Sequence, residues 1–99
     1  MPPGKPRVNV RPILECVSDL GGGRYVARFG YLNNGRFVVN VPVGPANRVV
    51  PSPLYRGQPT SFKAGRVRNV FQLQFDGRPL VWVLGGRTAT ASLASPRCP

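Results

Sequence analysis

Apolar and polar residues alternate over most of the chain, in short runs that end at Gly, Pro, Asn or Asp. The clearest run covers residues 24–32, where every second side chain falls on one face: Tyr25, Ala27, Phe29 and Tyr31. A period of two residues is typical of a β-strand, because successive side chains of a strand point to opposite faces. No stretch has a sustained helical period, so the sequence predicts an all-β chain.

Turn residues divide this pattern into roughly six to eight short strands. The predicted strands are residues 13–18, 24–32, 36–41, 67–75, 80–84 and 88–93, with a short edge strand near 48–50. Asn-Gly at 34–35 and Asp-Gly at 76–77 are strong signals for tight hairpins, so each should join two neighbouring strands. The strand after the first turn would then place Phe37, Val39 and Val41 in the core.

Residues 42–59 interrupt the pattern with five prolines. Proline cannot donate to the hydrogen-bond ladder of a sheet, so this stretch excludes a central strand and is typical of a long crossover. A hairpin on either side of a crossover suits a Greek key. We therefore expect an antiparallel β-sandwich with Greek-key topology and about seven strands, in preference to a small barrel.

The first twelve residues carry four prolines and several cations. They predict an extended N-terminal arm over residues 1–12, followed by a sandwich domain over residues 13–99. The step Val8-Asn9-Val10 has the alternation of a strand. That strand would either pair with its own domain or be added to a sheet edge of the next copy, and both alternatives stay open.

The two cysteines, Cys16 and Cys98, lack the close spacing of a metal or redox site. A disulfide that ties the first strand to the C-terminus is the favoured interpretation, and it would require an oxidising compartment. The alternative is a pair of free thiols in a reducing compartment.

The sequence offers few groups for catalysis. Histidine is absent, and the three carboxylates, Glu15, Asp19 and Asp76, are scattered. Asp76 suits a backbone role in its turn, and a hydrolase would need two carboxylates held at a fixed separation. The chain has no phosphate-binding loop or dinucleotide motif. We therefore predict no enzyme activity, no cofactor and no metal site; an enzyme would need a cofactor or a partner to bring the missing groups.

The chain has 14 Lys and Arg residues against three acids, a formal net charge of +11. This charge attracts polyanions such as nucleic acid or acidic polysaccharide, but it also fits a basic surface that only meets water. Several arginines alternate with aromatic residues, which suits base stacking; strand alternation would instead turn the rings inward and the arginines outward. The candidate polyanion-binding residues are Arg24, Arg28, Arg36, Arg66, Arg68 and Arg87.

Six segments in a fixed order resemble the repeat-type immunoglobulin-like β-sandwich modules of large bacterial surface and secreted proteins. They are LECV (Leu14–Val17), RYVARFGYLN (Arg24–Asn33), VPVGPANR (Val41–Arg48), RGQPTSFKAGR (Arg56–Arg66), LVWVLGGRTATAS (Leu80–Ser92) and SPRC (Ser95–Cys98). The resemblance implies an extracellular, often tandem module with a structural or adhesive role, no catalytic site and paired cysteines. This chain departs from such modules because it is strongly basic and begins with an arm.

These observations predict an extracellular structural or adhesive subunit that assembles with copies of itself, as in a filament or surface layer, through sheet edges and the arm. The alternative is a basic module that binds a polyanion. No segment has the length of a membrane span, and the N-terminus lacks the apolar run of an uncleaved signal peptide. Secretion would therefore apply to a mature form or a fragment; a cytosolic chain is the alternative.

Overall fold

The computed structural model describes residues 9–51 and 56–99. All regular secondary structure in these ranges is β-strand. Val8 and most of the predicted arm lie outside the described residues. The strands are β1 (Val10–Gly21), β2 (Arg24–Asn33), β3 (Val39–Asn40), β4 (Asn47–Val50), β5 (Ser61–Phe62), β6 (Gly65–Phe75), β7 (Leu80–Leu84) and β8 (Arg87–Ala91). The described residues contain no helix long and apolar enough to cross a membrane.

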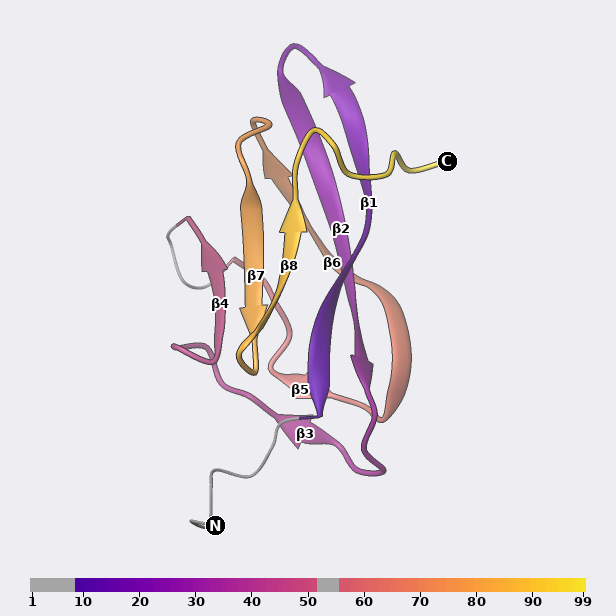
Figure 1. Cartoon of the computed structure of the whole chain (residues 1–99), viewed down its shortest axis with the longest axis vertical. Coiled ribbons are helices and arrows are strands. Elements are labelled where there is room, and N and C mark those ends of the chain that lie inside the picture. The colour runs from indigo at the N-terminus through magenta and orange to yellow at the C-terminus, as the bar shows by residue number, and fades with distance from the viewer. Residues whose placement is uncertain (1–8, 52–55) are drawn as a thin grey trace.

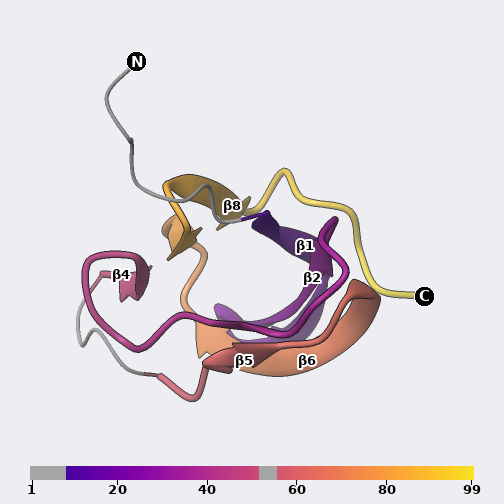
Figure 2. The same cartoon turned by 90° about the horizontal axis from the view of Figure 1, so that it is seen from below.

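The strands form three small antiparallel sheets (Figure 1). One sheet has the order β1-β2-β6, a second has the order β4-β7-β8, and β3 pairs with β5. Seen from below, the strands curve around a shared interior (Figure 2). An antiparallel sheet with one face inward and one in water has alternating side chains, which explains the period of two. The predicted antiparallel all-β chain is confirmed, with eight strands in place of about seven.

The core lies between the two three-stranded sheets and is centred on the single tryptophan. Trp82 of β7 is fully buried. It makes edge-to-face contacts with Phe29 of β2 and Phe71 of β6, at ring-centroid separations of 5.9 and 4.8 Å. Such aromatic pairs add about 0.5–1.5 kcal/mol beyond the burial of their area. These rings therefore join the two sheets, and their inward orientation agrees with the alternation in the sequence.

The predicted hairpins at residues 33–35 and 76–77 are wrong. After β2 the chain crosses to β3, which pairs with β5, and after β6 it crosses to β7 in the other sheet. The actual hairpins lie at glycine turns, residues 22–23 between β1 and β2 and residues 85–86 between β7 and β8. All four glycines have positive φ, which they adopt without steric cost. A turn dipeptide bends the chain locally, but burial of the apolar faces decides which strands pair.

The predicted strand over residues 36–41 is reduced to Val39–Asn40, and the prediction that Phe37 faces the core is wrong. Phe37 is 80% exposed. The cause is the buried side chain of Asn33, which donates hydrogen bonds to the carbonyl oxygens of Phe37 and Phe62. These bonds hold residues 34–38 in a loop and break the alternation that would have turned Phe37 inward.

The folded domain begins earlier than the predicted boundary at residue 13, because β1 starts at Val10. Val10 is buried opposite Asn33 of β2, and the carbonyl oxygen of Asn9 accepts a hydrogen bond from the amide of Asn34. Asn9 and Val10 therefore contact their own domain. A truncation that ends at Pro12 would remove part of β1.

Cys16 of β1 and Cys98 form the predicted disulfide, across a sequence separation of 82 residues. The C-terminal segment lies beside β1 at this point. The amide of Val17 donates to the carbonyl oxygen of Pro96, and the amide of Cys98 donates to the carbonyl oxygen of Val17. The segment thus satisfies backbone groups that an edge strand would otherwise leave unpaired.

Candidate binding surfaces

The described residues contain no group of three or more His, Cys, Asp or Glu side chains placed to bind a metal ion. The surface features that stand out are exposed apolar side chains at the two ends of the molecule and arginines on the outer faces of the strands. The candidate surfaces are a loop at the lower end of Figure 1, a hairpin at the upper end, a belt of arginines and a small cleft.

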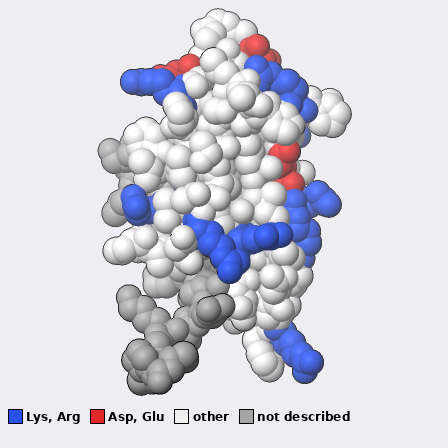
Figure 3. All heavy atoms as spheres, in the orientation of Figure 1, with Lys and Arg blue, Asp and Glu red and all other residues white. Residues whose placement is uncertain are grey.

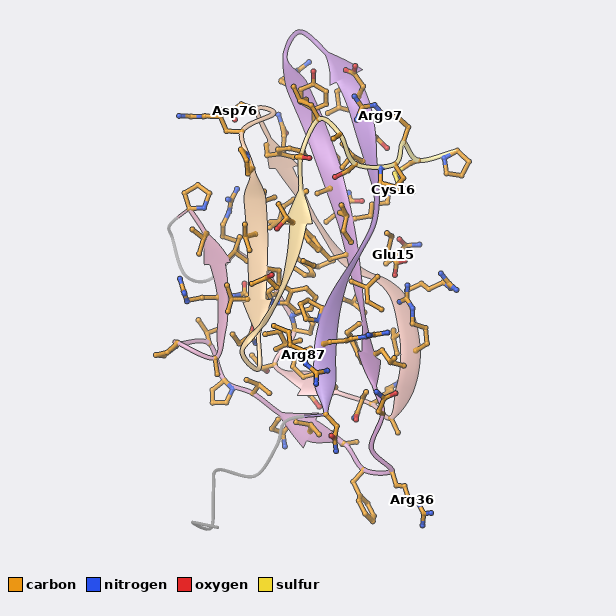
Figure 4. All side chains as sticks on the ribbon, viewed as in Figure 1. Glu15, Cys16, Arg36, Asp76, Arg87 and Arg97 are labelled. Atoms are coloured by element: carbon orange, nitrogen blue, oxygen red, sulfur yellow. A yellow bond between two sulfur atoms is a disulfide. The ribbon has the colours of Figure 1, made fainter. Side chains whose placement is uncertain are left out.

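The lower end carries the loop of residues 34–38, named here the Phe37 loop (Figure 4). Phe37 is 80% exposed, Val38 is 55% exposed, and Arg36 beside them is also exposed. Asn33 anchors the loop from a fully buried position. Its side-chain amide donates to the carbonyl oxygen of Phe37 at 2.9 Å, and its side-chain oxygen accepts from the amide of Gly35 at 2.9 Å. The loop therefore presents an aromatic ring on a backbone that is already held in place.

The opposite end carries the hairpin between β1 and β2, residues 19–24, named here the upper tip (Figure 1). Leu20 in this hairpin is 49% exposed. The strand register shifts between Asp19 and Gly21, so Leu20 is the extra residue of a β-bulge. A bulge bends its strand and re-aims the side chain. The carboxylate of Asp19 accepts a hydrogen bond from the amide of Gly21 at 2.8 Å. The upper tip thus presents an apolar side chain beside a carboxylate.

An ion pair crosses the sheet β1-β2-β6 between its two outer strands. The Glu15 carboxylate of β1 lies 2.6 Å from Arg66 of β6, and Arg68 lies 3.6 Å from the same oxygen. The Glu15 side chain is only 10% exposed. The pair lies over Gly30 of β2, where an added Cβ would collide with the Glu15 carboxylate and the carbonyl oxygen of Val67. Glycine at position 30 therefore makes room for this charge pair.

The belt of arginines, named here the basic belt, consists of Arg11, Arg66, Arg68 and Arg87. Arg11 of β1 and Arg66 of β6 both lie opposite Leu32 of β2, so their backbones are about 10 Å apart. Arg87 begins β8, which lies beside β1, and cations cross this part of the surface in Figure 3. Sequence reasoning missed Arg11 because it assigned residues 1–12 to the arm; an alternation that started at Val10 was the available signal.

The other three arginines of the predicted set lie elsewhere. Arg24 belongs to the upper tip, and Arg36 belongs to the Phe37 loop at the other end (Figure 4). Arg28 lies on the outer face of β2, opposite Cys16 and Gln72. The structure therefore brings Arg66, Arg68 and Arg87 to the basic belt and does not bring the six predicted arginines into one cluster.

A cleft of about 200 Å³ lies between Pro51 and the turn that follows β6. Arg78 at this cleft pairs with Asp76 at 2.7 Å, and the hydrogen bond from Arg78 lowers the pKa of the Asp76 carboxyl. Arg56 donates a hydrogen bond to the carbonyl oxygen of Gln74. The cations of the cleft are therefore already engaged with groups of the protein itself.

Comparison with known proteins found no family model, no curated protein and no solved structure that matches the chain. The resemblance to immunoglobulin-like modules of bacterial surface proteins therefore stays a prediction.

Proposed function

We propose that the chain is an extracellular, non-catalytic structural module with an immunoglobulin-like sandwich fold, and that it assembles with copies of itself. The observation that carries the proposal is the Phe37 loop. Burial of a phenylalanine side chain is worth about 1.5–3 kcal/mol, so a loop that is anchored with this ring in water favours an interface there. The Cys16–Cys98 disulfide supports an oxidising compartment.

The anchoring of the Phe37 loop bears directly on affinity. A loop that becomes ordered only on binding loses conformational entropy at that moment, and this loss is subtracted from the free energy of association. Asn33 already holds the backbone of Phe37 through a hydrogen bond inside the domain. Aromatic side chains, phenylalanine included, are enriched at the buried centres of protein interfaces.

The sequence predicted assembly through sheet edges and the arm. The C-terminal segment occupies the edge of β1 around Val17, and Val10 is buried inside its own domain. Addition of a partner strand at this point of β1 would have to displace bonds that the chain already makes. This favours assembly through the ends of the molecule over strand addition to β1.

Replacing Phe37 with serine is expected to weaken self-association at least tenfold, because the variant loses the burial of the ring. Sedimentation equilibrium over a range of concentrations measures the association constant. The matched control is Val50→Ser, which changes another exposed apolar side chain, on β4. Phe37→Ser should melt at the wild-type temperature, since its ring is 80% exposed; Val50→Ser should melt slightly lower, since Val50 is only 36% exposed. Equal association of the wild type and Phe37→Ser would count against the proposal.

A second candidate function is the binding of a polyanion at the basic belt. The observation that favours it is the placement of Arg11 and Arg87 on adjacent strands, neither of them in an ion pair among the described residues. Arg66 and Arg68 are partly neutralised by Glu15 and contribute less. A belt of this kind would recognise a polyanion by the sign and density of its charge and not by its sequence.

In this second candidate, affinity for a short DNA duplex should fall steeply with salt. Each phosphate contact contributes about −0.9 to the slope of log K against log salt concentration. The double variant Arg11→Gln/Arg87→Gln should flatten the slope by about 2. The control Arg36→Gln/Arg48→Gln removes the same charge outside the belt and should leave the slope nearly unchanged. Fluorescence anisotropy measures the affinity of each variant over a range of salt concentrations. Equal slopes for the two variants would show that the basic belt is not the binding site.

A further inference from the structure

We infer that the Phe37 loop binds the upper tip of a second copy of the chain, with Arg36 against Asp19 and Phe37 against Leu20. This inference rests on the proposed self-assembly and names its contact. The two surfaces lie at opposite ends of the long axis of the molecule (Figures 1 and 4). Each has an apolar side chain next to a charged one in sequence, Phe37 beside Arg36 and Leu20 beside Asp19, and these two charges are opposite. The upper tip also contains Arg24, on the β2 side of the hairpin.

The apolar halves of the two surfaces are exposed by specific local structure. Leu20 is the extra residue of a bulge at a hairpin tip where residues 19–24 are all exposed, and Phe37 lies in a loop where Asn33 holds its carbonyl oxygen. Val38 at 55% exposure and Leu93 at 52% add apolar area to the lower and upper ends, respectively. Leu93 packs close to Gly77, in the turn after β6.

The charged halves of the two surfaces are complementary. The chain has only three carboxylates, and two of them are engaged: Glu15 with Arg66, and Asp76 with Arg78. Asp19 has no arginine or lysine within ion-pair distance among the described residues. Arg36 likewise has no carboxylate partner there. Among the described residues, the side-chain carboxylate without a cationic partner therefore lies at one end, and an arginine without a carboxylate partner lies at the other.

The net charge of +11 makes identical copies repel one another. Whether this contact forms therefore depends on how far that repulsion reaches through a salt solution. At physiological ionic strength the screening length is about 8 Å. Arginines on the middle of two molecules joined end to end lie well beyond this distance from each other. Charges that meet at the contact itself are screened less, so the Arg36–Asp19 pair can orient the copies.

A contact between the lower end of one copy and the upper end of the next is heterologous. Such a contact leaves a free surface of each kind and propagates into an open chain of copies. The two surfaces are small, and interfaces below about 1,200 Å² are typical of weak encounters. The contact would therefore be strengthened greatly where copies are tethered or locally concentrated, because the effective concentration of a tethered partner is high.

Charge reversal at each end tests the contact. Asp19→Arg alone and Arg36→Glu alone should each weaken self-association about tenfold at 0.15 M salt, because each replaces an attractive pair by a repulsive one. An equimolar mixture of the two variants should recover wild-type association, since every end then finds a partner of opposite charge. The double variant Asp19→Arg/Arg36→Glu should recover it without mixing. Sedimentation equilibrium supplies the association constants.

One control variant and two outcomes separate this inference from the proposed function. Arg48→Glu reverses an arginine outside both tips, and its association should stay at the wild-type level. If Phe37→Ser weakens association while the charge reversals do not, the loop binds another surface and the head-to-tail contact is wrong. If the wild type stays monomeric at all concentrations, both the contact and the proposed self-assembly are wrong.

Discussion

Replacing both cysteines with serine is expected to lower the free energy of unfolding by about 4–5 kcal/mol. A cross-link over 82 residues restricts the unfolded chain, and the loop-entropy relation gives about 4.5 kcal/mol for that length. Domains of this size are stable by about 5–15 kcal/mol, so the double variant should retain only a small margin. Guanidinium unfolding followed by the fluorescence of Trp82, the single tryptophan, measures the change.

The single variants Cys16→Ser and Cys98→Ser should each lose as much as the double variant, because either change removes the same cross-link. Dithiothreitol should destabilise the wild type and leave the double variant unaffected. A loss below about 1 kcal/mol would mean that the backbone bonds of Val17 to the C-terminal segment suffice to hold the segment in place.

The second large effect is expected at Asn47, which is fully buried at the start of β4. Its side-chain amide donates to the carbonyl oxygens of Val41 and Pro59 at 2.9 and 2.8 Å, and its side-chain oxygen accepts from the indole N–H of Trp82 at 2.9 Å. Asn47→Ala would leave two buried polar groups and the half-buried carbonyl oxygen of Pro59 without this partner, and each buried group costs about 1–3 kcal/mol. We expect a loss of about 3–5 kcal/mol, measured by the same unfolding experiment.

The matched control is Asn40→Ala, which changes an exposed asparagine on β3 and should alter stability by less than about 0.5 kcal/mol. A double-mutant cycle with Trp82→Phe isolates the indole bond, because Trp82→Phe should cost less once Asn47 is already alanine. Additive losses in the cycle, or a loss below about 1 kcal/mol for Asn47→Ala alone, would contradict the assigned role.

Two buried asparagines therefore hold the backbone of the segments that contain few strand residues. Asn47 ties both ends of the proline-rich crossover to the core, through Val41 and Pro59. Asn33 ties the Phe37 loop to the end of β2 and to Phe62 of β5. In each case one side chain satisfies several backbone groups that a regular strand would have paired. The presentation of Phe37 to solvent is thus a consequence of the fold and not of a disordered loop.

The alternation of residue types by itself determined the all-β class and the inward face of β2, although it placed Phe37 inward and the structure does not. This was possible because the period of two is a local property of the extended backbone and needs no knowledge of the partner strand. The disulfide was also foreseen, since two distant cysteines without metal-site spacing have few other roles.

Only the tertiary structure decided the pairing of strands and the surfaces proposed for binding. Asn34-Gly35 bends the chain in the same way in a hairpin and in a crossover, so its presence could not tell which sheet the next strand would join. Glu15 and Arg66 are 51 residues apart and meet only because β1 and β6 flank β2. The exposure of Leu20 and Phe37 likewise depends on a register shift and on a buried asparagine. The ion pair, and the bond from Asn33 to Phe62, join residues distant in sequence, so the alternation along the chain carries no record of them.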